Sequence, residues 1–188
     1  MAWDPFRPLR PPRPLRPLRR KLFVSYHHKD QDYRDELDRH FNHLFINKSV
    51  CAGEIDTELS TEYVDRLIRD DYISDASVVL VLIGPRTYCR KHVDWEIAAG
   101  LNPKVRGRSG LFGMLLPNHP DYVSATYWRP LIPPRLLDNV DTGYAEIYHW
   151  TLNQQQVVWM VNRAFDKKND RFVRSVNTRL QFTRNLCG

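Results

Sequence analysis

The sequence lacks the features that mark several classes of protein. Its 188 residues include eight glycines, three cysteines and three methionines, and no glycine-rich phosphate loop is present. No apolar stretch approaches the roughly 20 residues that a helix needs to cross a bilayer. The positive charges near the N-terminus are followed by neither the hydrophobic core nor the cleavage site of a secretory signal. We therefore expect a cytoplasmic protein that does not associate with a membrane.

The three cysteines, Cys51, Cys89 and Cys187, are sparse and widely separated. An odd, scattered set fits neither a disulfide framework nor a metal cluster, so we expect reduced thiols. Cys89 lies near the candidate site described below, but the sequence shows no partner that would activate it as a catalytic thiol. The pair His27-His28 and the other histidines lack the cysteine or acidic spacing of known metal sites, so we expect no metal.

The net charge of +6 is concentrated at one end of the chain. Residues 1–20 hold six arginines and one acidic residue, and residues 5–20 contain six prolines. Prolines at this density disfavour helix and sheet, so the segment 1–20 is predicted to be a disordered or polyproline II leader. It could be a ligand for a partner, an arm that touches nucleic acid, or a solvated leader without a specific role. Residues 21–188 are nearly balanced in charge and form the predicted domain.

Strand and helix patterns alternate through this domain. The residues 77–83 are apolar without alternation, which is typical of a strand buried on both faces of a parallel sheet. Helical spacing or capping predicts helices at 32–46, 60–71, 90–101 and 153–167, and strands are predicted at 22–25, 49–52, 77–83, 111–116 and 144–150. This order predicts an α/β, doubly wound, flavodoxin-like fold with a parallel five-stranded sheet in the order 2-1-3-4-5. Residues 117–143 are predicted to be an irregular insertion, and a helical extension is predicted at the C-terminus.

The carboxyl ends of the first and third predicted strands should meet at the switch point of such a sheet, where ligands bind. Glu96 lies in the helix that follows the third strand, between Trp95 and Ile97. A lone carboxylate among apolar neighbours at this place is our candidate for a catalytic residue. The alternative is that Glu96 is a solvated helix residue paired with Arg90 or a similar base.

Other side chains around the same crevice are weaker candidates for substrate binding. Tyr26 could stack on a ring, Ser25 could donate to a hydroxyl or phosphate, and His27 follows them in the chain. Arg86 could meet a phosphate, and Asp56 lies in a polar loop. For each of them the alternative is ordinary packing, turn formation or solvation.

Several short motifs resemble those of TIR domains. Phe23-Val-Ser-Tyr26 is similar to their opening strand motif, 53–59 lies where they carry the mobile BB loop, and 75–84 resembles their third strand. The segment 88–98 is similar to the helix that bears their catalytic glutamate. Over roughly residues 20–165 the chain most resembles the TIR-like subunit of bacterial Thoeris antiphage systems.

One residue departs from the motif of that family. His92 stands where a tryptophan is often found, four residues before Glu96, so the two side chains share a helix face. His92 could stack on a base as an indole does, or pair with Glu96 and keep it ionised. It could also signal altered substrate handling or a degenerate site.

The resemblance implies an enzyme that cleaves the nicotinamide–ribose bond of NAD. NAD would be its substrate, with no separate cofactor, and the product would be a cyclic or conjugated ADP-ribose signal that activates a downstream effector. The leaving group is already cationic and needs no proton, so one carboxylate, Glu96, could suffice by stabilising the oxocarbenium-like ribose. The resemblance also implies self-association into an oligomer or filament, and activation by a phage component.

Two other functions remain open from the sequence. A non-catalytic TIR-like assembly module would signal through protein contacts and would tolerate Glu96→Gln. A nucleic-acid-binding protein would use the arginines of residues 7–20 and would bind with steep salt dependence. We favour the NAD-processing enzyme and do not expect the domain to bind nucleic acid.

Overall fold

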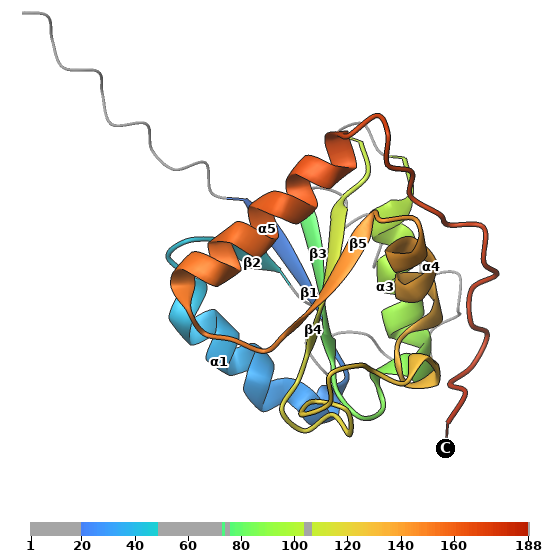
Figure 1. The fold of residues 1–188 in the computed structure, drawn as a ribbon, viewed down its shortest axis with the longest axis horizontal. Coiled ribbons are helices and arrows are strands. Elements are labelled where there is room, and N and C mark those ends of the chain that lie inside the picture. The colour runs from blue at the N-terminus through green and yellow to red at the C-terminus, as the bar shows by residue number, and fades with distance from the viewer. Residues whose placement is uncertain (1–19, 49–72, 74–75, 104–106, 188) are drawn as a thin grey trace, which may run out of the picture.

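The structure is a computed structural model that describes residues 20–48, 73, 76–103 and 107–187. At its centre is a parallel sheet with the strand order β2-β1-β3-β4-β5 (Figure 1). The strands are β1 Lys21–Ser25, β2 Ile46–Lys48, β3 Val78–Ile83, β4 Gly110–Leu115 and β5 Ala145–His149. The predicted α/β fold with a parallel sheet is therefore confirmed, and it is consistent with a flavodoxin-like TIR-type architecture.

Helices cover both faces of the sheet (Figure 1). Helices α1 and α5 pack on one face, and α3 and α4 pack on the other. Their bounds are α1 Gln31–Phe41, α3 Lys91–Leu101, α4 Pro134–Asp141 and α5 Gln154–Asn169, with short 3-10 turns η1 His28–Asp30, η3 Thr87–Cys89 and η4 Arg129–Leu131. Within the described part of the chain, no helix combines the length and apolar character needed to cross a membrane.

Strand β3 is buried on both faces, as its apolar run predicts. Val79, Val81 and Ile83 contribute to the core beneath α3 and α4. The alternate residues, Val78, Leu80 and Leu82, contribute to the core beneath α1 and α5. Because successive side chains of a strand point to opposite faces, only an unbroken apolar sequence can fill both cores.

The second strand begins earlier than predicted, at Ile46 rather than at residue 49. The helix pattern seemed to continue to residue 46 because Leu44 and Phe45 keep the apolar spacing. Helix α1 instead ends at Phe41, and Phe45 packs beside it with 6.5 Å between the ring centroids. The predicted strand 49–52 and helix 60–71 lie outside the described residues.

The segment 117–143, predicted to be irregular, contains helix α4. Its prolines suggested a loop, but Pro134 occupies the start of α4, where the missing N–H costs no helical hydrogen bond. Leu136 and Leu137 then pack into the core on the α3 side of the sheet. The proline-rich segment therefore contains a helix that, together with α3, covers one face of the sheet.

The predicted C-terminal helical extension is wrong for the residues that follow α5. Between Asp170 and Cys187 the chain forms no helix. It runs as an extended segment over α3 and α4 (Figure 1). We call residues 173–187 the C-terminal strap. Its side chains are mostly exposed, so a helix here would have no buried apolar face to stabilise it.

Candidate functional site

Ser25 and Glu96 meet at the carboxyl end of β1, beside β3. The Ser25 hydroxyl donates a hydrogen bond to Glu96 Oε2 at 2.5 Å. Ser25 is the last residue of β1 and is paired in register with Val81 of β3, while Glu96 projects from α3. The structure thus brings together two residues that the topology predicted to share one crevice, although they are 71 positions apart.

Glu96 is a buried acid. Its exposed fraction is 4%, so the alternative of a solvated helix residue is wrong. Burial raises the pKa of Glu96 to about 8, and the hydrogen bond from Ser25 opposes this rise without cancelling it. In the free protein at pH 7 the protonated form of this carboxyl therefore predominates, and ionisation requires a higher pH or a nearby positive charge.

His27 is buried in a defined tautomer at the turn after β1. Its Nδ1 accepts a hydrogen bond from the Lys29 backbone N–H at 3.0 Å and so caps η1. Burial first, and the charge of Arg90 second, lower the pKa of His27 to about 3, so the ring is neutral. With Nδ1 accepting, the ring proton is on Nε2. That Nε2 is buried and has no hydrogen-bond partner.

Tyr26 and His92 form hydrogen bonds within the fold. The hydroxyl of the buried Tyr26 donates to Gln31 Oε1 at 2.5 Å. His92 Nε2 lies 3.3 Å from the Tyr26 carbonyl oxygen, and burial lowers the pKa of His92. The backbone of Tyr26 therefore engages His92, and the lowered pKa disfavours the charged ring that an ion pair with Glu96 would need.

Arg86 lies at the turn between β3 and α3. Arg86 is exposed and immediately precedes η3; burial first, and the charge of Arg86 second, lower the pKa of Arg90. Asp56 lies outside the described residues. Across the described residues, no three histidine, cysteine, aspartate or glutamate side chains are grouped so that they could hold a metal ion.

Arg90 is a further candidate for substrate binding; from the sequence it was expected only as a possible partner of Glu96. It immediately precedes α3, and its charge is close enough to contribute to the lowered pKa of His27. Its Nε is buried and has no hydrogen-bond partner. Two buried N–H groups without acceptors, on Arg90 and His27, therefore lie in the same region. The signal in the sequence was a basic residue directly before the helix that carries Glu96.

A second buried carboxylate on α3, Asp94, was also missed. Arg135 of α4 binds it through two contacts, Nε to Oδ1 at 2.8 Å and Nη2 to Oδ2 at 3.1 Å. Asp94 is 3% exposed and Arg135 is 1% exposed. The backbone N–H of Phe182 in the C-terminal strap donates to Asp94 Oδ2 at 3.0 Å. Asp94 thus joins α3, α4 and the strap.

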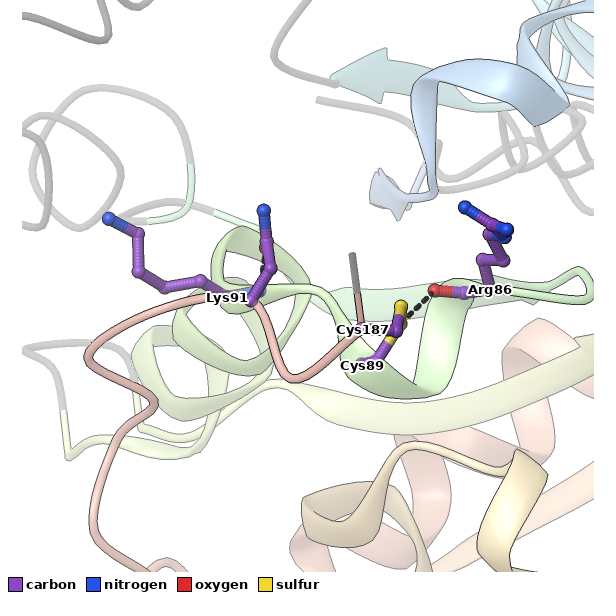
Figure 2. The surroundings of a disulfide bond; sticks show 5 residues. Arg86, Cys89, Lys91 and Cys187 are labelled. Atoms are coloured by element: carbon purple, nitrogen blue, oxygen red, sulfur yellow. Dashed lines mark hydrogen bonds between the residues drawn. A yellow bond between two sulfur atoms is a disulfide. The ribbon is translucent and has the colours of Figure 1, made fainter.

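The expectation of reduced thiols is wrong for two of the three cysteines. Cys89 and Cys187 form a disulfide at the start of α3 (Figure 2). This also removes the alternative of Cys89 as a catalytic thiol, since a disulfide sulfur carries no thiolate. The pair was invisible in the sequence because 98 positions separate the two residues and the strap brings them together. Cys51 lies outside the described residues.

Comparison with known proteins identifies a family for this segment of the chain. A family model described as the TIR-like domain of the Thoeris protein ThsB matches residues 23–121. No curated protein matched the sequence. The matched range includes the end of β1 from residue 23, all of β3 and all of α3, and hence Ser25 and Glu96. It ends before α4, β5, α5 and the C-terminal strap, so Arg135 and Cys187 lie beyond it.

Proposed function

The chain belongs to the family of the TIR-like domain of the Thoeris protein ThsB, and from this premise we propose that it cleaves NAD between nicotinamide and ribose. Membership of this family supports a role in antiphage defence. The product of the proposed reaction is a cyclic or conjugated ADP-ribose signal for a downstream effector. The observation that carries the proposal is the buried Ser25–Glu96 pair at the switch point of the sheet.

In this proposal Glu96 acts electrostatically. The electron pair of the breaking C1′–N bond leaves with the nicotinamide nitrogen, which becomes neutral, and the ribose takes up the positive charge. The Glu96 carboxylate stabilises that charge until C1′ is attacked by a nucleophile within the substrate, by an acceptor that forms a conjugate, or by water. The attacking group then loses its proton to solvent. Because Glu96 is buried, its charge is screened less than it would be in water. Ser25 orients the carboxylate through its hydrogen bond.

The raised pKa of Glu96 gives this mechanism a pH signature. Only the ionised carboxylate can stabilise a cationic ribose, and burial raises the pKa of Glu96 to about 8. The value of kcat/KM, which reports groups of the free enzyme, should therefore rise with pH and level off above about pH 8. Binding of the positively charged nicotinamide ring favours the ionised form, so the corresponding rise in kcat should lie at lower pH.

We further propose that Arg90 and His27 bind the diphosphate of NAD. Both present buried N–H groups without acceptors, and phosphate oxygens are strong acceptors. His27 is neutral and contributes a donor, while Arg90 contributes the positive charge. Arg90→Gln should raise KM for NAD roughly tenfold, the effect of losing one charge-assisted hydrogen bond of about 1.5 kcal/mol. Arg39→Gln, which alters an exposed arginine on α1, is the matched control and should leave KM near the wild-type value.

The decisive experiment is chromatography of NAD incubated with wild type, Glu96→Gln and Asp166→Asn, with and without lysate from phage-infected cells. Asp166 is an exposed carboxylate on α5, so its variant controls for the loss of one negative charge. Wild type and Asp166→Asn should release nicotinamide, and Glu96→Gln should be slower by roughly 100-fold or more.

Two results would reject the proposal. If Glu96→Gln cleaves NAD at the wild-type rate, Glu96 is not the catalytic residue. If no protein consumes NAD even with infected lysate, while all three still assemble or bind a partner, the non-catalytic assembly module is the better account. The identity of the product peak separates free ADP-ribose from a cyclic isomer or a conjugate.

A further inference from the structure

The C-terminal strap follows α3 along its length, in the direction opposite to the helix. Near the C-terminal end of α3, the Asn177 side chain donates to the Ala98 carbonyl oxygen at 3.0 Å and to Asn102 Oδ1 at 2.8 Å. The backbone of Val176 is held by Asn139 of α4, which donates at 2.8 Å and accepts at 2.9 Å. The strap is thus anchored to both helices at its beginning.

The middle of the strap is held by the two residues that precede Glu96. The Trp95 indole N–H donates to the Phe182 carbonyl oxygen at 2.8 Å, and the Phe182 N–H donates to Asp94 at 3.0 Å. These bonds satisfy buried polar groups of α3 itself. The strap therefore helps to fix the rotation of the helix that presents Glu96.

The end of the strap is attached at the first turn of α3. Asn185 Oδ1 accepts from the Lys91 N–H at 3.0 Å, and the Leu186 N–H donates to the Cys89 carbonyl oxygen at 2.9 Å. The Lys91 N–H is one of the four at a helix start that have no partner within the helix. The Cys89–Cys187 disulfide lies next to these two bonds (Figure 2).

We propose that the Cys89–Cys187 disulfide is a thiol-reducible lock that holds the strap on α3 and thereby positions Glu96. Residues 183–186 are exposed, and Leu186 is 61% exposed, so little apolar burial holds this part of the strap. Without the disulfide, the two hydrogen bonds of Asn185 and Leu186 would have to order it alone. The effect on catalysis rests on the proposed function, whereas the lock itself does not.

The accessibility of the two sulfurs fixes the direction of the opening reaction. Cys89 is completely buried and Cys187 is only partly buried, so an incoming thiolate attacks Cys187 Sγ. The S–S bond breaks, its electron pair leaves on Cys89 Sγ, and a mixed disulfide remains on Cys187. A second thiolate attacks the reductant sulfur of that mixed disulfide, which yields the oxidised reductant and a free Cys187 thiolate. A small-molecule disulfide such as oxidised glutathione closes the lock by the reverse steps.

The test uses the full chain with Cys51→Ser, so that the disulfide pair holds the only remaining cysteines. Amide hydrogen exchange is measured by NMR in oxidised protein and in protein reduced by glutathione. Reduction should accelerate exchange at Leu186 and Lys91 at least tenfold. The matched control, Cys51→Ser with Cys187→Ser, should exchange under both conditions at the faster rate expected of the reduced Cys51→Ser protein. Because reduced Cys51→Ser protein supplies the same comparison, the test does not depend on how well the control folds.

Two results of these measurements would overturn the lock. The first is exchange at Leu186 and Lys91 that is unchanged by reduction. The second is alkylation of both cysteines in protein incubated with oxidised glutathione, since it would show that the disulfide does not form. Reduction by glutathione should also lower kcat for NAD several-fold in the Cys51→Ser protein. It should not change kcat in the control, which has no disulfide. An unchanged kcat despite faster exchange would overturn the positioning of Glu96. If no state cleaves NAD, the proposed function fails, and hydrogen exchange still decides the lock.

Discussion

Asp94 and Glu96 are two carboxylates on one helix with nearly equal burial and opposite surroundings. They are 3% and 4% exposed. Two residues along an α-helix correspond to a rotation of about 200°, so the side chains project to opposite sides of α3. Asp94 meets the guanidinium of Arg135 and a backbone N–H, whereas Glu96 meets the hydroxyl of Ser25. The two carboxylates therefore differ in how their charge is compensated and not in how deeply they are buried.

Under the proposed function, Asp94 suits a structural role and Glu96 suits a chemical one. The negative charge of Asp94 is neutralised within the fold, where it joins α3, α4 and the C-terminal strap. The negative charge of Glu96 is poorly compensated, which is why its pKa is raised. A cationic ribose would supply the missing positive charge. Interactions that become strong only in the transition state are those that accelerate a reaction.

The largest effect on stability should come from removing the counter-charge of Asp94. Arg135→Gln removes the guanidinium and leaves the Asp94 carboxylate buried without a counter-charge. We expect the free energy of unfolding to fall by about 3–5 kcal/mol, as for other buried pairs that lose one partner. Urea denaturation measures it. Adding Asp94→Asn should recover part of the loss, and a decrease below about 1 kcal/mol for Arg135→Gln would contradict this account.

The next effect concerns the strap that lies on the Asp94 side. Cys187→Ser should lower the free energy of unfolding by about 2–4 kcal/mol in oxidising buffer, because the disulfide joins residues 98 positions apart. In a reducing buffer the variant and wild type should unfold at the same urea concentration. A difference that persists under reduction would mean that Cys187 stabilises the fold by packing instead.

The poorly compensated charge of Glu96 should make the stability of the protein depend on pH. The pKa of Glu96 is higher in the folded protein than the ordinary 4.5, so folding favours the protonated form. This contribution to stability is complete at low pH and is lost as pH rises toward about 8, by about 1.4 kcal/mol per pH unit. Relative to wild type, Glu96→Gln should therefore gain about 2–3 kcal/mol between pH 6 and pH 8. Parallel stability curves for the two proteins would show that the pKa of Glu96 is not raised.

The smallest effect should come from the single hydrogen bond to Glu96. Ser25→Ala removes the hydroxyl that favours the ionised carboxylate, so the pKa of Glu96 should rise further. The pH at which kcat/KM reaches half its maximum should move upward, and the free energy of unfolding at pH 7 should change by about 1 kcal/mol or less. Ser25→Thr, which keeps a hydroxyl, serves as the control. A pH profile unchanged by Ser25→Ala would separate the hydroxyl from the titration of Glu96.

The sequence pattern and the strand order were sufficient to predict that Ser25 and Glu96 meet on one side of α3. The apolar run of β3 predicted a strand buried on both faces, and the strand order then placed Ser25 beside Glu96. A buried parallel strand has a direct sequence signature, and the ligand-binding edge of an α/β sheet follows from its connections. The prediction of Asp56 in the site lies outside the described residues and stays a prediction.

The other side of α3 depends on partners that no local pattern reveals. Arg135 is 41 positions from Asp94 in a segment that its prolines made look irregular. The C-terminal strap is held by side-chain amides and backbone groups rather than by a buried apolar face, as at Asn139 and Asn177. Such contacts are fixed by the tertiary fold rather than by spacing along the chain. The disulfide was missed for the same reason.

The distance of the strap from its partners along the chain has a consequence for protein synthesis. Cys187 is translated 98 residues after Cys89, which takes about 5–20 s at ordinary rates of elongation. During that interval the nascent chain already contains Trp95 and Asp94, but their partner Phe182 has not been made. The helix that carries Glu96 can reach its final attachment only after the strap has left the ribosome. Until then the Cys89 thiol has no Cys187 to pair with, and a ribosome that stalls between them would hold the protein with its strap unmade.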